Sequence, residues 1–131
     1  MRLVLIFCGF FLLTPAVFAE DGEETAAPEA IYLPLSPQFT VNLLGDKHYL
    51  RTSIQLQLAN DEVKEAIQQN DAAIRHALIV LLSDNNVDEI STSDGLNTLR
   101  KRATEVLNDT LKKYAKTEGV TDVFFTDFVS Q

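Results

Sequence analysis

Two histidines, one cysteine and 19 carboxylates are the side chains of this sequence most able to do chemistry. A protein zinc site collects three or four ligands from such residues at short, characteristic spacings. His48 and His76 fall in different predicted elements, and neither has a carboxylate or cysteine at ligand spacing. We therefore interpret both as surface or packing residues and expect no metal.

The remaining motifs that carry catalysis or cofactors are missing from the sequence. It contains no Gly-rich phosphate loop and no nucleophile elbow, and its carboxylates are scattered in the way typical of a solvated acidic surface. The stretch Asn108-Asp109-Thr110 matches a glycosylation sequon, but it lies inside a predicted helix and we interpret it as a chance match. We expect no catalytic residue, no cofactor and no enzymatic activity, and favour a protein that acts by binding other proteins.

The first 19 residues have the pattern of an export signal. Arg2 precedes a nearly unbroken apolar run from Leu3 to Phe18, and Val17-Phe18-Ala19 offers the small or β-branched residues that a signal peptidase accepts. The run is shorter than the about 20 apolar residues of a membrane span. Residues 1–19 are therefore predicted to be a cleaved signal peptide, with a membrane anchor as the alternative.

The charge balance excludes several kinds of partner. The whole chain has a net charge of −8, and Arg2 is the only charged residue in the predicted signal, so cleavage would leave −9. An acidic surface repels nucleic acid and anionic lipid headgroups, which require basic patches. Cys8 would leave with the signal, so the exported domain would have no disulfide.

The exported part is predicted to begin with a tether and a β-hairpin. Residues 20–30 are rich in carboxylates and hold no large apolar side chain, which indicates a flexible acidic tether before a domain that spans 31–131. Residues 39–58 alternate apolar and polar side chains around a turn at Gly45-Asp46-Lys47. This period of two indicates strands with one wet face.

Helices are predicted next. Asn60 is placed to cap a first helix that breaks or is capped again at Asn70-Asp71, and the following segment to Leu82 shows the apolar i, i+3, i+4 spacing of a buried stripe. Ser91 and Asp94 have the form of a capping box that opens a long amphipathic helix, which Gly119 can close. Its predicted buried stripe is Leu96, Leu99, Ala103, Val106, Leu107, Leu111 and Tyr114.

The last predicted element is a strand over residues 120–129. Large apolar side chains occupy both its odd-numbered and its even-numbered positions, and so both faces of the strand. This favours a central strand, with a partner-binding edge as the alternative. The order of two strands, helices and a final strand predicts a single α+β domain, with an antiparallel sheet packed against two or three helices. Gly95 stands in a first helical turn, where either close backbone packing or no special role would explain it.

Several segments together resemble the FliL family of flagellar basal-body-associated proteins. The resemblance covers residues 32–131 in order. Its segments are Tyr32-x-x-Leu35-x-Pro37-x-Phe39-x-Val41-Asn42-Leu43, Tyr49-Leu50-Arg51, Ile74-Arg75, Leu81-Leu82-Ser83, Thr92-x-x-Gly95-x-x-x-Leu99-Arg100, Asn108, and the ending from Val123 to Gln131. The terminal block is the most specific part.

This resemblance implies a periplasmic domain beside the flagellar motor, with a fold similar to the core of stomatin-like proteins. It implies support of the stator, of rotation, swimming, swarming and chemotaxis, and self-association into a ring. The family usually has a cytoplasmic segment and a true transmembrane helix, from which this N-terminus departs. Interaction or family-motif residues implied by the match are Asn42, Arg51, Gly95, Arg100, Phe125, Asp127 and Phe128.

Two other functions stay open from the sequence. A periplasmic ligand-binding domain would show a pocket with convergent polar groups, and a scaffold would show flat, self-complementary surfaces. An enzyme is the third and least favoured. Nucleic acid and a small-molecule substrate are not expected as partners, and the location expected is the periplasm at the inner-membrane basal body, or a single-pass inner-membrane protein.

Overall fold

The computed structural model describes residues 29–45 and 47–131. The predicted signal peptide, residues 20–28 of the predicted tether, and Asp46 of the predicted turn lie outside this part. None of the helices in the described part is long and apolar enough to cross a membrane.

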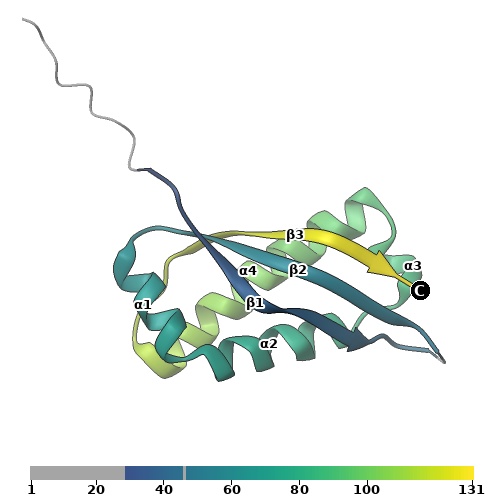
Figure 1. Ribbon diagram of the computed structural model, residues 1–131, viewed down its shortest axis with the longest axis horizontal. Coiled ribbons are helices and arrows are strands. Elements are labelled where there is room, and N and C mark those ends of the chain that lie inside the picture. The colour runs from purple at the N-terminus through teal and green to yellow at the C-terminus, as the bar shows by residue number, and fades with distance from the viewer. Residues whose placement is uncertain (1–28, 46) are drawn as a thin grey trace, which may run out of the picture.

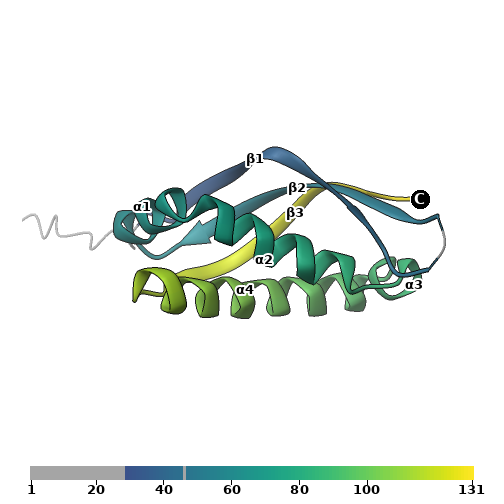
Figure 2. The same ribbon diagram turned by 90° about the horizontal axis from the view of Figure 1, so that it is seen from below.

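The described chain forms one antiparallel sheet with helices on one of its faces (Figures 1 and 2). The elements in chain order are β1 (Ile31–Asn42), β2 (Tyr49–Leu58), α1 (Asp61–Gln69), α2 (Asp71–Ser83), α3 (Val87–Ile90), α4 (Ser93–Ala115) and β3 (Val120–Ser130). The sheet order is β1-β2-β3, with antiparallel neighbours. The predicted α+β class is confirmed.

The first two strands form the expected hairpin. The strand β1 begins at Ile31, whereas the alternation of apolar and polar side chains in the sequence placed the hairpin over residues 39–58. Along β2 the residues of one parity, Leu50, Thr52, Ile54, Leu56 and Leu58, are buried against the helices. Those of the other parity face the uncovered side, as alternation requires. Gly45 has a φ of +92°, which glycine adopts without strain, so it permits the tight connection between the strands.

The outer strand β1 carries two features that limit further pairing. Its register with β2 shifts between Leu35 and Phe39, and it holds Pro34 and Pro37. Proline lacks the N–H that a further strand would need, so it is typical of edge strands. Inside this strand Phe39 is buried, and the Arg75 guanidinium of α2 lies 4.1 Å from its ring centroid.

The helix α1 begins and ends at the two asparagines that the sequence indicated, Asn60 and Asn70. The Asn60 side chain accepts a hydrogen bond from the Val63 amide at 3.0 Å, which confirms it as the N-cap of α1. Asn70 ends that helix, with its side-chain amide donating to the Ala66 carbonyl at 2.8 Å. The backbone continues directly into α2, whose buried stripe is Ile74, Leu78, Leu81 and Leu82.

The start of α4 differs by one residue from the predicted capping box. Thr92 is the N-cap, and its hydroxyl accepts from the Gly95 amide at 3.0 Å, whereas the Ser91 hydroxyl donates to the Val87 carbonyl. A capping box does occur, at Asn86 and Glu89, where it opens the short helix α3. This helix was not predicted, because a single turn is too short to show a 3.6-residue period.

The long helix α4 buries most of the predicted stripe. Leu99, Ala103, Leu107 and Leu111 are buried, and Leu96 and Val106 are half-buried. Tyr114 was wrongly assigned to the core, since it is 56% exposed. The helix ends at Ala115, and Lys116 takes the left-handed conformation (φ 55°), so Gly119 does not close it.

Of the two interpretations of the last strand, the favoured central position is wrong, since among residues 29–45 and 47–131 β3 pairs with β2 alone and lies at the edge of the sheet. A bulge explains the error. Between the pairs Arg51–Val129 and Ser53–Thr126, β3 has one residue more than β2, with Asp127 at a φ of 50°. The extra residue reverses the alternation. Phe125 and Phe128 therefore both pack against the core rather than on opposite faces.

Candidate functional site

The seven residues implied by the resemblance do not converge on one cavity. Arg100 reaches β3 from α4, and Phe125, Asp127 and Phe128 belong to β3 itself. Arg51 is exposed on β2 opposite Val129. Asn42 and Gly95 lie elsewhere, at the hairpin end of β1 and in the first turn of α4.

Arg100 joins α4 to β3 through three kinds of contact. Its Nη2 atom lies 2.6 Å from Oδ2 of Asp122, and its Nε donates to the Val123 carbonyl at 3.2 Å. Its guanidinium also lies 5.1 Å from the ring centroid of Phe124, within cation–π range. Both charged side chains are about one-third exposed, so solvent screens their attraction and the ion pair contributes only modestly to the free energy of unfolding.

The same contacts occupy part of the edge of β3. The Val123 amide donates to Oδ1 of Asp122 at 2.8 Å, and the Val123 carbonyl accepts from Arg100. The unpaired backbone N–H and C=O groups of an edge strand can otherwise form hydrogen bonds with a strand of another chain. The Arg100–Asp122 pair thus blocks strand addition at Val123, while β3 continues for several residues beyond it.

The bulge around Asp127 is held by β2. The buried Thr52 hydroxyl donates to the Thr126 carbonyl at 3.1 Å, and the Ser53 hydroxyl lies 3.4 Å from Oδ2 of Asp127. Phe125 and Phe128 meet edge to face with centroids 6.1 Å apart. These residues fix the shape of the strand end, and their rings stay half-exposed beside it.

Asn42 and Gly95 have local roles. Asn42 is exposed and pairs with Tyr49, whose hydroxyl donates to Oε1 of Gln131 at 2.8 Å. A Cβ on Gly95 would stand 1.6 Å from the Glu89 carbonyl oxygen of α3, so the residue permits close backbone packing. This contact supports the first of the two interpretations of Gly95.

Asn108, which belongs to both the sequon and the resemblance, ties α4 to the start of β3. Its Oδ1 accepts from the amides of Gly119 and Val120 at 3.0 and 2.9 Å, and its Nδ2 donates to the Val120 carbonyl at 2.9 Å. The amide nitrogen that a glycan would modify is therefore already engaged in a hydrogen bond that holds α4 to β3.

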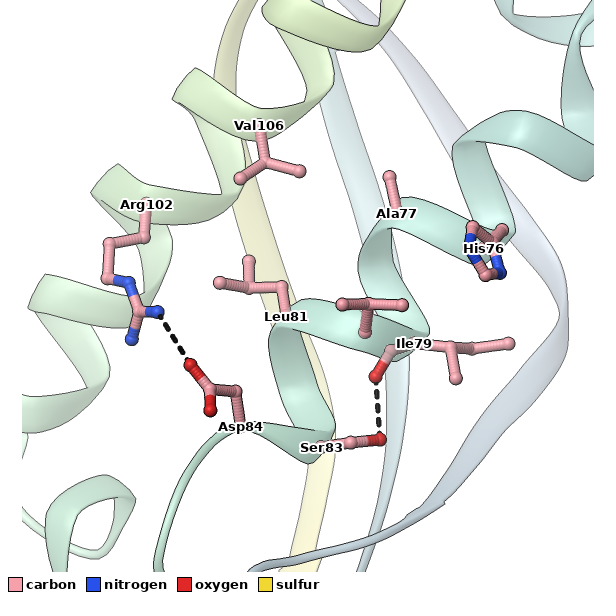
Figure 3. A pocket seen from close by; sticks show the side chains of 9 residues that line it. His76, Ala77, Ile79, Leu81, Ser83, Asp84, Arg102 and Val106 are labelled. Carbon is pink, nitrogen blue, oxygen red and sulfur yellow. Dashed lines mark hydrogen bonds and ion pairs between the residues drawn. The ribbon is translucent and has the colours of Figure 1, made fainter.

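Sequence reasoning missed a surface groove along α2 and α4, which Figure 3 shows. We call it the α2–α4 groove. Its lining is mainly apolar and its volume is about 670 Å³. Val106 of α4 faces Leu81 and Ala77 of α2, while His76 and Ile79 point to the other side of α2 (Figure 3). The remaining lining residues are Val80, Ser83, Asp84 and Arg102.

A signal for this groove was present in the sequence of α2. Ile79 and Val80 are apolar but stand outside the i, i+3, i+4 stripe that packs into the core, and they are 41% and 55% exposed. These two residues add apolar surface to the exposed side of α2, and both line the groove.

Charged groups border the groove without forming a polar centre. Arg102 Nη2 lies 3.6 Å from Oδ2 of Asp84, and both side chains are well exposed. His76 is exposed on α2 and His48 in the hairpin loop. Over residues 29–45 and 47–131, no three His, Cys, Asp or Glu side chains are grouped as a metal site would require.

At the far end of α4, the hydrogen bond from Lys112 to Glu118 (2.8 Å) raises the pKa of that lysine.

Comparisons with known proteins agree with the resemblance. A family model described as "Flagellar basal body-associated protein FliL" matches residues 32–131. The chain is similar to the flagellar protein FliL of Aquifex aeolicus (strain VF5), 35% identical over 111 residues, which are 82% of this chain and 66% of that protein. It is also similar to the flagellar protein FliL of Bacillus subtilis (strain 168), 32% identical over 91 residues, or 70% of this chain and 61% of that protein. The chain thus spans about two thirds of the first relative's length and less of the second's.

Proposed function

This chain belongs to the FliL family of flagellar basal body-associated proteins, and we propose that it supports the stator units of the flagellar motor by protein–protein contact, without catalysis. The observation that carries the proposal is the extent of the family match. It covers residues 32–131, and therefore every helix and nearly all of the sheet.

The surface of the domain supports a role in binding proteins. Among the described residues, no helix covers one face of the sheet (Figure 2), and the α2–α4 groove adds a second accessible surface. Exposed large apolar side chains are spread over both, among them Tyr32, Tyr49 and Val129 on the strands. Amphipathic aromatic residues of this kind are enriched in protein interfaces.

We further propose that copies of the domain assemble around the stator in the periplasm. The net charge of −8 makes copies repel one another, so self-association of the isolated protein is expected to be weak and to strengthen with salt. Recruitment by a stator would raise the effective concentration of the domain and complete a ring. Under this proposal, rotation, swarming and chemotaxis depend on the protein indirectly, through the torque that the stator delivers.

The α2–α4 groove gives some support to a second candidate function, small-molecule binding. Its volume of about 670 Å³ lies in the range of ligand pockets. The groove is, however, open at the surface, and its Arg102 and Asp84 side chains are paired with each other. A small ligand would find few convergent polar groups there, so a protein partner is the better fit.

A localisation experiment tests the proposal. In the bacterium that encodes it, the full chain fused to a periplasm-compatible fluorescent protein is expected to form foci at flagellar basal bodies. These foci should disperse when the stator genes are deleted and return when they are restored. Foci that persist without stators would rule out recruitment by the stator, and diffuse fluorescence in motile cells would count against any motor association.

A further inference from the structure

The two outer edges of the sheet belong to β1 and β3, and within the described part of the chain they are protected to different degrees (Figure 1). The edge of β1 carries two prolines and a register shift, both of which oppose further pairing. The strand β3 has no proline, and its protection is the Arg100–Asp122 pair, which engages the backbone of Val123. Residues 124–130, beyond that pair, are therefore the more open edge of the sheet.

Backbone groups at both ends of this open stretch of β3 point away from β2. The Gln131 N–H donates to the Tyr49 carbonyl of β2 at 3.0 Å, and the Gln131 carbonyl accepts from the Tyr49 N–H at 2.8 Å. Because successive residues of a strand direct these groups to opposite sides, those of Ser130 point away from β2. The Val123 carbonyl also points away from β2, toward α4, so alternation directs the backbone groups of Phe125 to that same side. Both ends can therefore bond to a further strand.

The side chains of β3 are apolar on both faces of the sheet and are only partly covered. Phe125 and Phe128 are half-buried on the side of the helices. On the uncovered face Phe124 is half-buried, and Val129, which lies opposite the exposed Arg51 of β2, is 38% exposed. A strand that is apolar on both faces is typical of the interior of a sheet. Two β3 strands that paired with each other would both lie in the interior of a sheet of six strands, three from each copy.

We propose that a second copy of the chain adds its own β3 to this edge, antiparallel and related by a two-fold axis. The register that fits places Phe124 opposite Val129 of the second copy on the uncovered face. On the side of the helices it places Phe125 opposite Phe128 of the second copy. Each apolar residue then meets an apolar residue, and cross-strand pairs of this kind stabilise a sheet. The bulge at Asp127 lies at the centre, so each copy contributes two short stretches to the contact.

The charges along β3 are compatible with this register. Asp122 is already paired with Arg100 of its own copy, and the register places it opposite Gln131 of the second copy. Asp127 lies opposite Thr126 of the second copy, so no two carboxylates of β3 face each other, which would be destabilising. The net charge of −8 still opposes association, so we expect a weak dimer that high salt strengthens by screening.

A second copy is the occupant that β3 itself specifies, because the strand carries the apolar pattern that matches its own edge on both faces. The inference goes beyond the proposed function. A two-fold contact uses the same surface on both copies and closes at two, so the ring proposed above needs a different contact surface.

Sedimentation velocity of the full chain, purified from the bacterium that encodes it, tests the inference. Over a wide range of concentration at high salt, the chain is expected to pass from monomer to dimer. Val129→Glu is expected to raise the Kd of the dimer at least tenfold, because it places a charge in the apolar contact. Val80→Glu makes the same substitution at an exposed position of α2 and should leave the Kd within about twofold. Circular dichroism establishes that both variants are folded.

Disulfide formation between copies tests the register. In a chain that carries Cys8→Ser, a Phe124→Cys variant is mixed with a Val129→Cys variant under mild oxidation. A covalent dimer is expected, since directly opposite residues of an antiparallel pair have Cβ atoms close enough for a disulfide. The control mixes Val129→Cys with Thr40→Cys, an exposed position on β1, and should give no covalent dimer above background.

Three results would overturn the inference. They are a chain that stays monomeric at every concentration and salt, a dimer whose Kd Val129→Glu does not change, and a disulfide that forms as readily with Thr40→Cys as with Phe124→Cys. The proposed function fails separately: a deletion strain with normal motility would remove the motor role and leave the dimer standing. A monomeric chain whose deletion impairs motility would do the reverse.

Discussion

Replacing Gly95 with alanine is expected to lower the free energy of unfolding by about 1–3 kcal/mol, the size of effect caused by overpacking a closely packed site. In an ordinary helical position the same change is stabilising by about 1 kcal/mol, because alanine is the better helix former. Here the new Cβ would stand 1.6 Å from the Glu89 carbonyl oxygen and 2.8 Å from its carbon. Backbone atoms cannot move aside alone, so α3 must separate from α4.

Urea denaturation of the two proteins measures the difference. Thr98→Ala is the control, since it introduces alanine almost one turn further along α4 at an exposed position. It should change stability by less than about 0.5 kcal/mol. A stabilised Gly95→Ala protein would show that the contact between α3 and α4 is not as close as described.

Replacing Leu107 with alanine is expected to destabilise the domain by about 2–5 kcal/mol, the range for removing a fully buried leucine. Leu107 is 0% exposed in the middle of α4, among core side chains from the sheet and from α2. The loss combines the apolar transfer free energy with the cavity that is left behind. Because the domain is small, such a loss is a large part of the stability usual for its size.

The control for Leu107 is Lys101→Ala on the exposed side of the same helix, expected within about 0.5 kcal/mol. Thermal and urea unfolding of both variants would be compared with the parent chain. Similar small effects at the two positions would mean that the buried face of α4 is assigned incorrectly.

Periodicity in the sequence was sufficient to predict the hairpin and the long helices. The residues of β2 alternate without exception from Leu50 to Leu58, and the core stripe of α4 repeats every three or four residues. Short-range polar signals also held where one side chain decides the geometry. The Asn60 cap is an example, since it needs only the side-chain oxygen Oδ1 of Asn60 and the backbone amide of Val63, three residues further along the chain.

The position of β3 could not be predicted, because it depends on a bulge that needs a partner strand. In the sequence Phe124, Phe125 and Phe128 place rings at both parities, which is typical of a central strand. In the fold the extra residue at Asp127 turns Phe128 to the side of Phe125. Phe124 remains on the other face, where it lies 6.3 Å from the Tyr32 ring and near Arg100.

The candidate sites were predictable only in part. The resemblance drew attention to Arg100 and Gly95, which in the fold contact β3 and α3 respectively. It gave no indication of the α2–α4 groove. That groove forms where two helices far apart in sequence pack together, so no single segment contains it.

Motility of a deletion strain tests the central claim, that the chain supports the flagellar motor, most directly. The gene would be deleted and restored in the source bacterium, and swimming and swarming measured at low and high medium viscosity while filaments are counted by electron microscopy. The account predicts reduced motility, most strongly at high viscosity, with a normal number of filaments and recovery when the full chain is restored. Unchanged swimming and swarming at every viscosity in the deletion strain would contradict it.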